Sequence, residues 1–331
     1  MRSRALEKVL RAAASAVLLL SGAARAAEEW PQKQPIVMIV PFAPGGASDF
    51  VARIIAPVLS SELKQTIVIE NKAGAAGNIG MEAAARAPAD GYTVYLGNVG
   101  TTAINPAIFG AQLKVKPLSD FVPVTKIVDV ADVLVVNNDL PVTTVKELVA
   151  YASSRKGQLN FGTPGAGSQN RLEMEMLMKA GGLEMMHVPY KGGAGPAVTD
   201  LVGGQTQVMF TTLPSAMQFA KAGRLRALAV TLASRVPDLP SVPTLAESGY
   251  PDMVSASWQG IFLPRGTPAP IVARLSAALH KLMPAEEIRQ KLAAGGALVS
   301  LSKTPEEFGA YVKAEADRWG ALVRERGITA N

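Results

Sequence analysis

The stretch Ile36–Leu63, IVMIVPFAPGGASDFVARIIAPVLSSEL, decides the fold. Residues 36–40 are a continuous apolar run, which indicates a strand covered on both faces of a parallel sheet. The turn at 44–46 follows, and Ser48 and Asp49 are natural N-caps for the apolar-periodic helix after it. A strand, a glycine turn and a helix N-terminus together present free backbone N–H groups to an anion. The stretch therefore predicts an anion site, although the same glycines could serve the turn alone.

The composition suits a globular protein of two ordinary domains. The chain has 331 residues, of which 48% are hydrophobic and 18% charged. A second glycine turn at 162–168 follows a short strand and precedes a Met-rich helix, about 120 residues after the first turn. Strand, glycine loop and helix also alternate through the rest of the chain, which indicates an α/β fold. Two turns of one design predict two lobes that face one cleft.

The first 26 residues have the pattern of a secretory signal peptide. Four basic residues precede the apolar segment 12–20, and Ala24-Arg25-Ala26 fits a cleavage site. The apolar segment is shorter than the roughly 20 residues that a membrane-spanning helix needs. We therefore expect export, cleavage near Ala26, and a freely soluble protein in the periplasm. The absence of cysteine excludes a disulfide and an acylated lipoprotein terminus.

The basic charge belongs largely to this leader. The formal net charge is +6, and residues 1–26 carry +4 of it, so the mature chain carries +2. No dense basic run with interleaved aromatic residues is present. The sequence therefore does not support nucleic-acid binding.

The residue inventory argues against an enzyme. His187 and His280 are the only histidines, and the chain has no cysteine, no H-E-x-x-H and no G-x-S-x-G motif. We expect no catalytic residue, metal site or cofactor, and an exported hydrolase is a remote alternative. The loop at 71–80 spaces its glycines as G-x-x-G-x-x-G, which differs from the dinucleotide fingerprint. The methionines at 174–186 are typical of adaptable packing.

Several segments in order resemble one known family. The chain is similar to the extracytoplasmic solute-binding proteins of tripartite tricarboxylate transporters, the Bug family, from about Trp30 to Gly327. The segments that carry the resemblance are VPFAPGGASDFVARIIAP, NKAGAAGNIG, APADGYTVYLG, GTPGAGSQ, HVPYKGG and TDLVGGQTQVMF.

The resemblance implies a two-lobed periplasmic binding protein of type II, a Venus flytrap with two hinge crossings. Lobe one would combine residues 27–126 and 255–331, and lobe two would be 127–254. A small carboxylate, either a di- or tricarboxylate or an aromatic acid, would bind between the lobes. The expected partners are this ligand and the membrane subunits of a tripartite transporter, with the chain itself a monomer. Presentation of the liganded protein to a sensory system is the alternative.

The family holds the ligand carboxylate through backbone N–H groups and water in the two glycine loops. The resemblance and the strand ends therefore give these candidate ligand-binding residues: Phe42, Ala43, Gly45, Gly46, Ala47, Ser48, Asp49, Asn98, Thr101, Thr163, Gly165, Ala166, Gly167, Ser168, Gln169, Tyr190 and Thr211. Asp49 could instead cap a helix, and Tyr190 could pack. Whether Arg171, Lys191 or Trp258 reaches the ligand stays open, with an outward position favoured for Arg171 and a core position for Trp258.

Three positions depart from the family pattern. Thr211-Thr212 stands where many members have Asp-Asn, Arg171 where many have histidine, and Ala73 where proline is usual. If position 211 lines the cleft, the missing acid removes a partner for an amino group. That hypothesis favours ligands without an α-amine.

Overall fold

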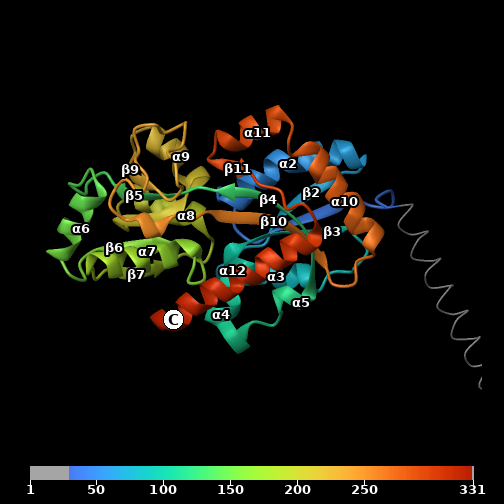
Figure 1. Ribbon diagram of the computed structural model, residues 1–331, viewed down its shortest axis with the longest axis horizontal. Coiled ribbons are helices and arrows are strands. Elements are labelled where there is room, and N and C mark those ends of the chain that lie inside the picture. Colours follow the sequence, from blue (N-terminus) through green and yellow to red (C-terminus); the bar gives the residue numbers. More distant parts are fainter. Residues whose placement is uncertain (1–29, 330–331) are drawn as a thin grey trace, which may run out of the picture.

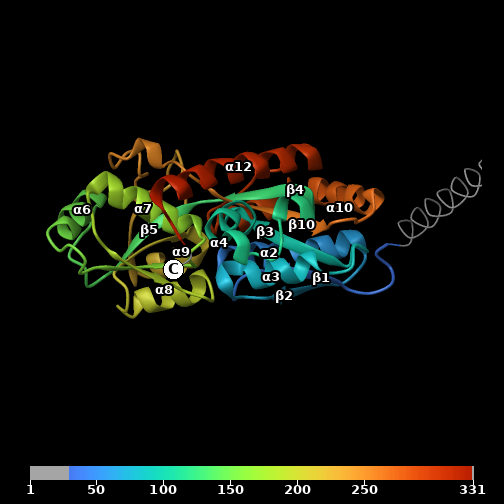
Figure 2. The same cartoon turned by 90° about the horizontal axis from the view of Figure 1, so that it is seen from below.

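The computed structural model describes residues 30–329, so the predicted signal peptide at 1–26 lies outside the described residues. The described chain forms two lobes side by side along the long axis of the molecule (Figures 1 and 2). Each lobe is built on one sheet flanked by helices. The predicted α/β, two-lobed architecture is confirmed.

The sheet of the first lobe has six strands in the order β11-β4-β10-β3-β1-β2. β1 lies between β2 and β3 and is parallel to both, whereas β10 is antiparallel to β3 and β4. The strand bounds are β1 Ile36–Val40, β2 Ile67–Asn71, β3 Thr93–Asn98, β4 Phe121–Val130, β10 Ser257–Pro264 and β11 Ala297–Val299. The apolar run at 36–40 is therefore an inner strand, which explains why its residues are apolar without alternation.

The sheet of the second lobe has five strands in the order β7-β6-β8-β5-β9. β6 is parallel to β7 and β8, and β5 is antiparallel to β8 and β9. The bounds are β5 Asp132–Asn137, β6 Asn160–Thr163, β7 Met186–Pro189, β8 Val208–Thr212 and β9 Leu225–Val230. Parallel β6 and β8 place the glycine turn after β6 and the polar end of β8 on the same edge of the sheet.

The chain passes between the sheets at two points. β4 ends at Val130 and β5 begins at Asp132, so the first crossing is at Ala131. The return lies between the end of β9 at Val230 and the start of β10 at Ser257. β4 therefore continues past residue 126, where we predicted the first lobe boundary.

Helices cover both sheets. Those packed in the first lobe are α2 Ala47–Leu63, α3 Asn78–Ala85, α4 Asn105–Phe109, α5 Pro117–Asp120, α10 Ala269–Leu282, α11 Glu286–Ala293 and α12 Pro305–Arg326. The second lobe has α6 Val145–Ser153, α7 Gln169–Gly181, α8 Ala194–Val202 and α9 Leu213–Lys221. Short turns complete the chain: η1 Ala75–Gly77, the π-helical η2 Gly100–Ile104, η3 Gly110–Gln112 and η4 Pro251–Met253. None of the helices in the described residues is long and apolar enough to cross a membrane.

The N-terminus of α2 differs from the prediction. Its N-cap is Gly46, and no side chain caps it. Ser48 and Asp49, the predicted caps, lie inside the first helical turn and are buried. The helix starts earlier because Gly46, with φ −92° and ψ 173°, already has the extended conformation of an N-cap.

Helix α12 runs along the first lobe, and its C-terminal end reaches α7 of the second lobe (Figure 2). Arg171 of α7 donates from Nη1 to the carbonyl of Thr329 at 2.8 Å, and its neighbour Leu172 packs in one core cluster with Val323 and Ile328. The favoured outward position of Arg171 is therefore wrong, because its side chain is buried in this contact between the lobes.

Candidate ligand-binding site

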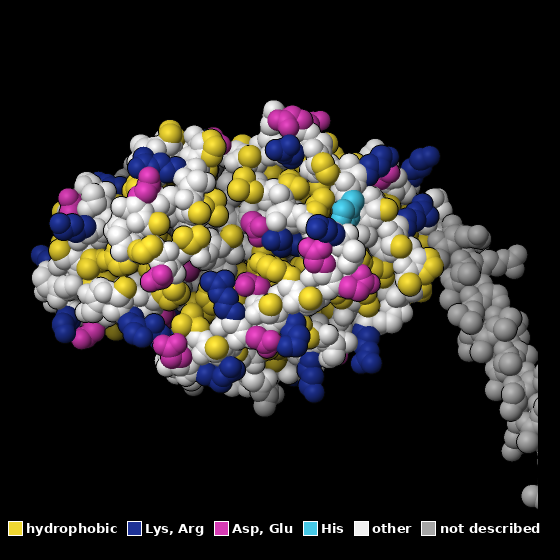
Figure 3. All heavy atoms as spheres, in the orientation of Figure 1, with side chains coloured by type: hydrophobic (Ala, Val, Ile, Leu, Met, Phe, Trp, Pro, Cys, Tyr) yellow, Lys and Arg dark blue, Asp and Glu magenta, His cyan; other side chains and the backbone are white. Residues whose placement is uncertain are grey.

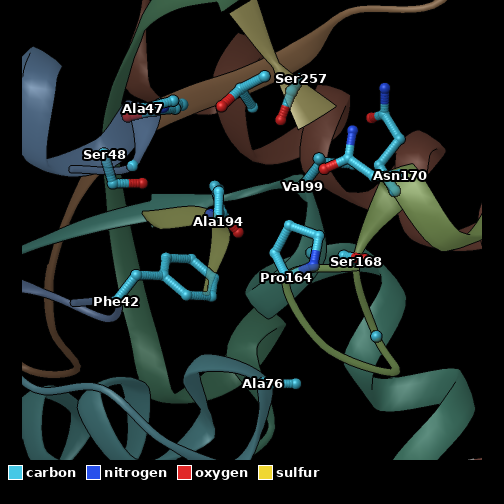
Figure 4. Close-up of a pocket in the computed structure, with 17 residues that line it drawn as sticks. Phe42, Ala47, Ser48, Ala76, Val99, Pro164, Ser168, Asn170, Ala194 and Ser257 are labelled. Carbon is cyan, nitrogen blue, oxygen red and sulfur yellow. The ribbon is translucent and has the colours of Figure 1, made fainter. Parts of the chain in front are cut away.

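A cavity lies between the two lobes (Figure 4). It encloses about 550 Å³ of space, counted with its mouth. The residues that line it are Phe42, Gly46, Ala47, Ser48, Ala76, Asn98, Val99, Gly100, Pro164, Gly167, Ser168, Gln169, Asn170, Ala194, Thr212, Ser257 and Gln259. No charged side chain is in this set, so an anion here would be held by dipoles.

The cavity brings together eight of the candidate residues from the sequence: Phe42, Gly46, Ala47, Ser48, Asn98, Gly167, Ser168 and Gln169. The other nine lie outside its lining: Ala43, Gly45, Asp49, Thr101, Thr163, Gly165, Ala166, Tyr190 and Thr211. Most of these nine are neighbours of lining residues in the same loops.

Three helices begin at the cavity. α2 contributes Ala47 and Ser48, α7 contributes Gln169 and Asn170, and α8 contributes Ala194. Neither α2 nor α8 has a side chain that caps its first N–H groups, because both N-caps are glycines. At α7 the Ser168 hydroxyl accepts from the N–H of Arg171. Free N–H groups at helix N-termini attract a carboxylate without any basic side chain.

Asn98 supplies a fixed donor on the lobe-one wall. Its Oδ1 accepts from the N–H of Thr101 at 2.9 Å and from the Thr101 hydroxyl at 3.2 Å. That hydroxyl in turn receives a hydrogen bond from Tyr95 at 2.8 Å. Because its oxygen is engaged, the amide nitrogen of Asn98 remains to donate toward the cavity. Thr101 therefore orients Asn98 and does not line the cavity itself.

The lobes touch around the cavity through backbone rather than long side chains. The N–H of Ala43 donates to the carbonyl of Gly192 at 3.0 Å, from one lobe to the other. A Cβ at Gly195 would lie 2.7 Å from the carbonyl oxygen of Pro44, and one at Gly165 would lie 3.1 Å from Cβ of Ala76. The glycines are needed here because a side chain would hold the lobes apart. The described structure is thus a closed form.

Asp49 fixes the first glycine loop from behind. Its carboxylate accepts from the N–H of Gly45 at 3.1 Å, from Arg53 at 2.9 Å and from Asn71 at 3.2 Å. Burial opposes ionisation, but the hydrogen bonds from Arg53, Gly45 and Asn71 outweigh it and lower the pKa of Asp49. Its contacts are those of a loop-positioning residue.

The remaining candidates are held in similar ways. Tyr190 donates to Asp200 at 2.8 Å, and burial together with this carboxylate raises the pKa of Tyr190 to about 12. Lys191 is exposed. Trp258 is fully buried and donates from Nε1 to Glu315 at 3.0 Å, which is the core role favoured for it.

Thr212, rather than the predicted Thr211, lines the cavity. Side chains alternate along a strand, and Thr212, at the end of β8, lines the cavity with its hydroxyl 2.8 Å from that of Ser215. Thr211 is fully buried outside the lining. The hypothesis that position 211 selects against amino groups therefore loses its premise.

Sequence reasoning missed nine lining residues, among them Ser257 and Gln259. Both lie on β10, at the second crossing between the lobes. A polar pair in the otherwise apolar run SWQGIFLP was the available signal, because buried polar residues in a strand need a reason. Asn170 follows the predicted loop by one residue and lies on the cavity wall beside Ser168 (Figure 4).

His187 makes stability depend on pH at this site. Its Nε2 lies 2.7 Å from the Thr163 hydroxyl, and its ring stacks on Phe161. Burial, and then the charge of Arg171, lower the pKa of His187 to about 4. The unfolded chain takes up a proton below about pH 6.5, whereas the folded chain does not until about pH 4. Stability should therefore fall as the pH drops from about 6.5 to about 4.

At pH 5 the His187→Gln variant should lose about 1 kcal/mol less free energy of unfolding than the wild type. This figure is discounted because the ring of His187 is partly exposed. The measurement is the thermal midpoint of both proteins from pH 4 to 8. Above pH 7 the two curves should run parallel, which is the internal control. Equal slopes between pH 4 and 6.5 would contradict the assignment.

On the face in Figure 3, Lys and Arg side chains are interspersed with Asp and Glu, and no continuous basic patch is visible. Within residues 30–329 no cluster of three or more His, Asp or Glu side chains is placed to hold a metal ion.

Comparisons with known proteins converge on one group. The family model described as "Tripartite tricarboxylate transporter family receptor" matches residues 51–328. Protein BugT of Bordetella pertussis is 36% identical over 301 residues, which cover 91% of each chain.

Two solved structures are similar over nearly their whole length. An R. palustris protein solved with adipate is 37% identical with a TM-score of 0.87, covering 91% of this chain and 99% of that one. MatC from Rhodopseudomonas palustris, solved with malate, is 33% identical with a TM-score of 0.83, covering 88% and 99%. The predicted periplasmic-binding-protein fold is confirmed by this likeness.

Proposed function

The chain belongs to the tripartite tricarboxylate transporter receptor family, and we propose that it captures a small carboxylate in the periplasm for a transporter of that kind. The ligand binds between the lobes, and the closed, liganded protein delivers it to the membrane subunits. Relatives solved with adipate and with malate support a carboxylate as the ligand class. The leader-like segment at 1–26 supports export.

One observation carries this proposal. The cavity between the lobes is lined by no charged side chain, yet three helix N-termini and the Asn98 amide direct donors toward it. A carboxylate gains charge-assisted hydrogen bonds from such donors, and its burial needs no lysine or arginine. A neutral ligand would leave the helix dipoles unused.

The protein does no chemistry in this account. Its work is capture, closure of the lobes and presentation of a closed surface to the membrane partner. The closed form is stabilised by backbone contacts such as that between Ala43 and Gly192, which form only when the lobes meet.

A thermal-shift screen tests the ligand class. The panel holds di- and tricarboxylates, aromatic acids and amino acids, each beside its carboxamide. A carboxylate at about 100 times its Kd should stabilise the protein by about 2.7 kcal/mol, which raises the midpoint by roughly 4 °C. The carboxamides should give little or no shift. Shifts that are equal for acids and amides would contradict the proposal.

A further inference from the structure

Two buried amide oxygens at the cavity have no hydrogen-bond partner. They are Gln169 Oε1 on α7 and Gln259 Oε1 on β10, one from each lobe. Both residues line the cavity, and their exposed fractions are only 2% and 1%. Within residues 30–329, they are the only cavity-lining residues with a buried, unpartnered side-chain N or O atom. Because a buried acceptor without a hydrogen bond destabilises the protein, these two oxygens call for donors from a bound molecule.

The orientation of Gln169 is fixed by a pair of buried carboxylates. Its Nε2 donates to Asp132 Oδ2 at 3.1 Å and to Glu173 Oε1 at 2.9 Å. Nδ2 of Asn170 donates to the opposite oxygens, Asp132 Oδ1 at 2.8 Å and Glu173 Oε2 at 3.1 Å. Both protons of each amide are used, and every carboxylate oxygen receives one. We call these four residues the amide–carboxylate clamp.

The clamp prevents Gln169 from turning its nitrogen toward the ligand. A rotated amide would set its oxygen against two carboxylates and lose both donated bonds. Burial, and then the neighbouring Glu173 carboxylate, raise the pKa of Asp132 well above its ordinary value. If Asp132 carries a proton, the two carboxyl groups still offer more acceptor sites than the clamp has donors. The orientation of the Gln169 amide is therefore the same in either protonation state of Asp132. Ser255, near the second crossing, adds a bond of 2.6 Å to Glu173.

We propose that the ligand carries a hydrogen-bond donor, a hydroxyl or an ammonium group, in addition to its carboxylate, and that Gln169 Oε1 accepts from this donor. The inference rests on the proposed function and assigns the specificity of the same site. The carboxylate lies against the donors of the helix N-termini and Asn98. The donor group of the ligand faces the side-chain oxygens of Gln169 and Gln259. Gln259, for whose side-chain amide no hydrogen bond is found within residues 30–329, turns to suit the ligand.

The donor enters before the lobes close. In the closed form both oxygens have almost no exposure to bulk solvent, so their partners must be enclosed with the ligand. A ligand without a donor therefore closes the lobes over the unpaired Oε1 of Gln169, which the clamp prevents from turning, whereas a hydroxy or amino acid of the same length pairs this oxygen. The difference favours the substituted ligand by at least about fivefold.

Matched ligand series test the inference by calorimetry. The series are succinate, malate and aspartate; glutarate, 2-hydroxyglutarate and glutamate; and adipate, 2-hydroxyadipate and 2-aminoadipate. In the series that binds, the hydroxy or amino member should bind at least about fivefold tighter than its parent, and comparing the two separates hydroxyl from ammonium. Parents that bind as tightly as the substituted acids overturn the inference and leave the proposed function standing. Absence of binding by every acid overturns both.

A variant of the amide–carboxylate clamp provides a second test of the inference. Glu173→Gln places an amide against Gln169 and Asn170, so one of them must turn, and the preference for the donor-bearing ligand should collapse. Asp132→Asn is the second variant if Glu173→Gln does not fold by circular dichroism. Glu175→Gln is the matched control, because Glu175 lies on the same helix and pairs with Arg171 instead. A preference that survives both clamp variants overturns the role of the clamp.

Discussion

Replacing Gly167 by alanine is expected to weaken ligand binding about 10- to 100-fold while both lobes stay folded. Gly167 is in the lobe-two loop, and a Cβ there would overlap the Oδ1 atom of Asn105 in lobe one and lie 2.9 Å from its Cγ. Asn105 cannot easily move, because it is fully buried and donates to Ala76 and Asn78. The added methyl group therefore holds the lobes apart.

Calorimetry with the best carboxylate and circular dichroism of the free protein measure this effect. Gly203→Ala is the matched control, since a Cβ there would meet nothing closer than 3.6 Å. The double variant Gly167→Ala with Asn105→Ala removes the clashing amide and should recover part of the affinity. If Gly167→Ala binds like the wild type, the loop does not meet lobe one when ligand is bound.

Gly46→Val is expected to weaken binding at least about 100-fold for a different reason. A Cβ at Gly46 would meet only Cβ of Ala194, at 3.9 Å, and the backbone conformation there accepts any residue. The lobes can therefore still close. The branched methyl groups instead fill the cavity at the first N–H groups of α2, where we place the ligand carboxylate.

Gly46→Ala is the control for size, and it should bind within about threefold of the wild type because its single methyl group fits. The same titration series measures both variants, and small-angle scattering reports whether the lobes still close. Equal affinity for the valine and alanine variants would show that the carboxylate lies elsewhere. The variants at the two glycines thus distinguish two causes of weaker binding: lobes that cannot close at Gly167, and a cavity that is filled at Gly46.

Much of the fold was predictable because it depends on local patterns. The apolar run at 36–40 and the glycine turns after two strands specify parallel strand–helix units, and the two-lobed α/β prediction is confirmed. The N-cap of α2 was misplaced because serine and aspartate are better caps in general than the glycine that the chain uses. Propensity alone does not place the crossings; the lobe bounds follow from the family resemblance, and the first crossing in the structure lies at Ala131, after the predicted boundary at residue 126.

The site was predictable only where it is contiguous in the sequence. The two glycine loops contain most of the lining residues that were expected, because each loop follows its strand directly. Gln259 comes from a distant segment, after the second crossing, and no local pattern places it in the same cavity as Gln169. Arg171 appeared to face solvent because its partner, the carbonyl of Thr329, is 158 residues away. Such pairings depend on how the lobes meet.

The most direct test of the account is a calorimetric titration of the wild-type protein with its best carboxylate and with the matching carboxamide. Removal of the charge leaves size and shape nearly unchanged but weakens each hydrogen bond from the helix N-termini. We predict one saturable site for the carboxylate and at least about tenfold weaker binding of the amide. Equal affinity for the two would contradict the claim that helix N-termini between the lobes hold a carboxylate.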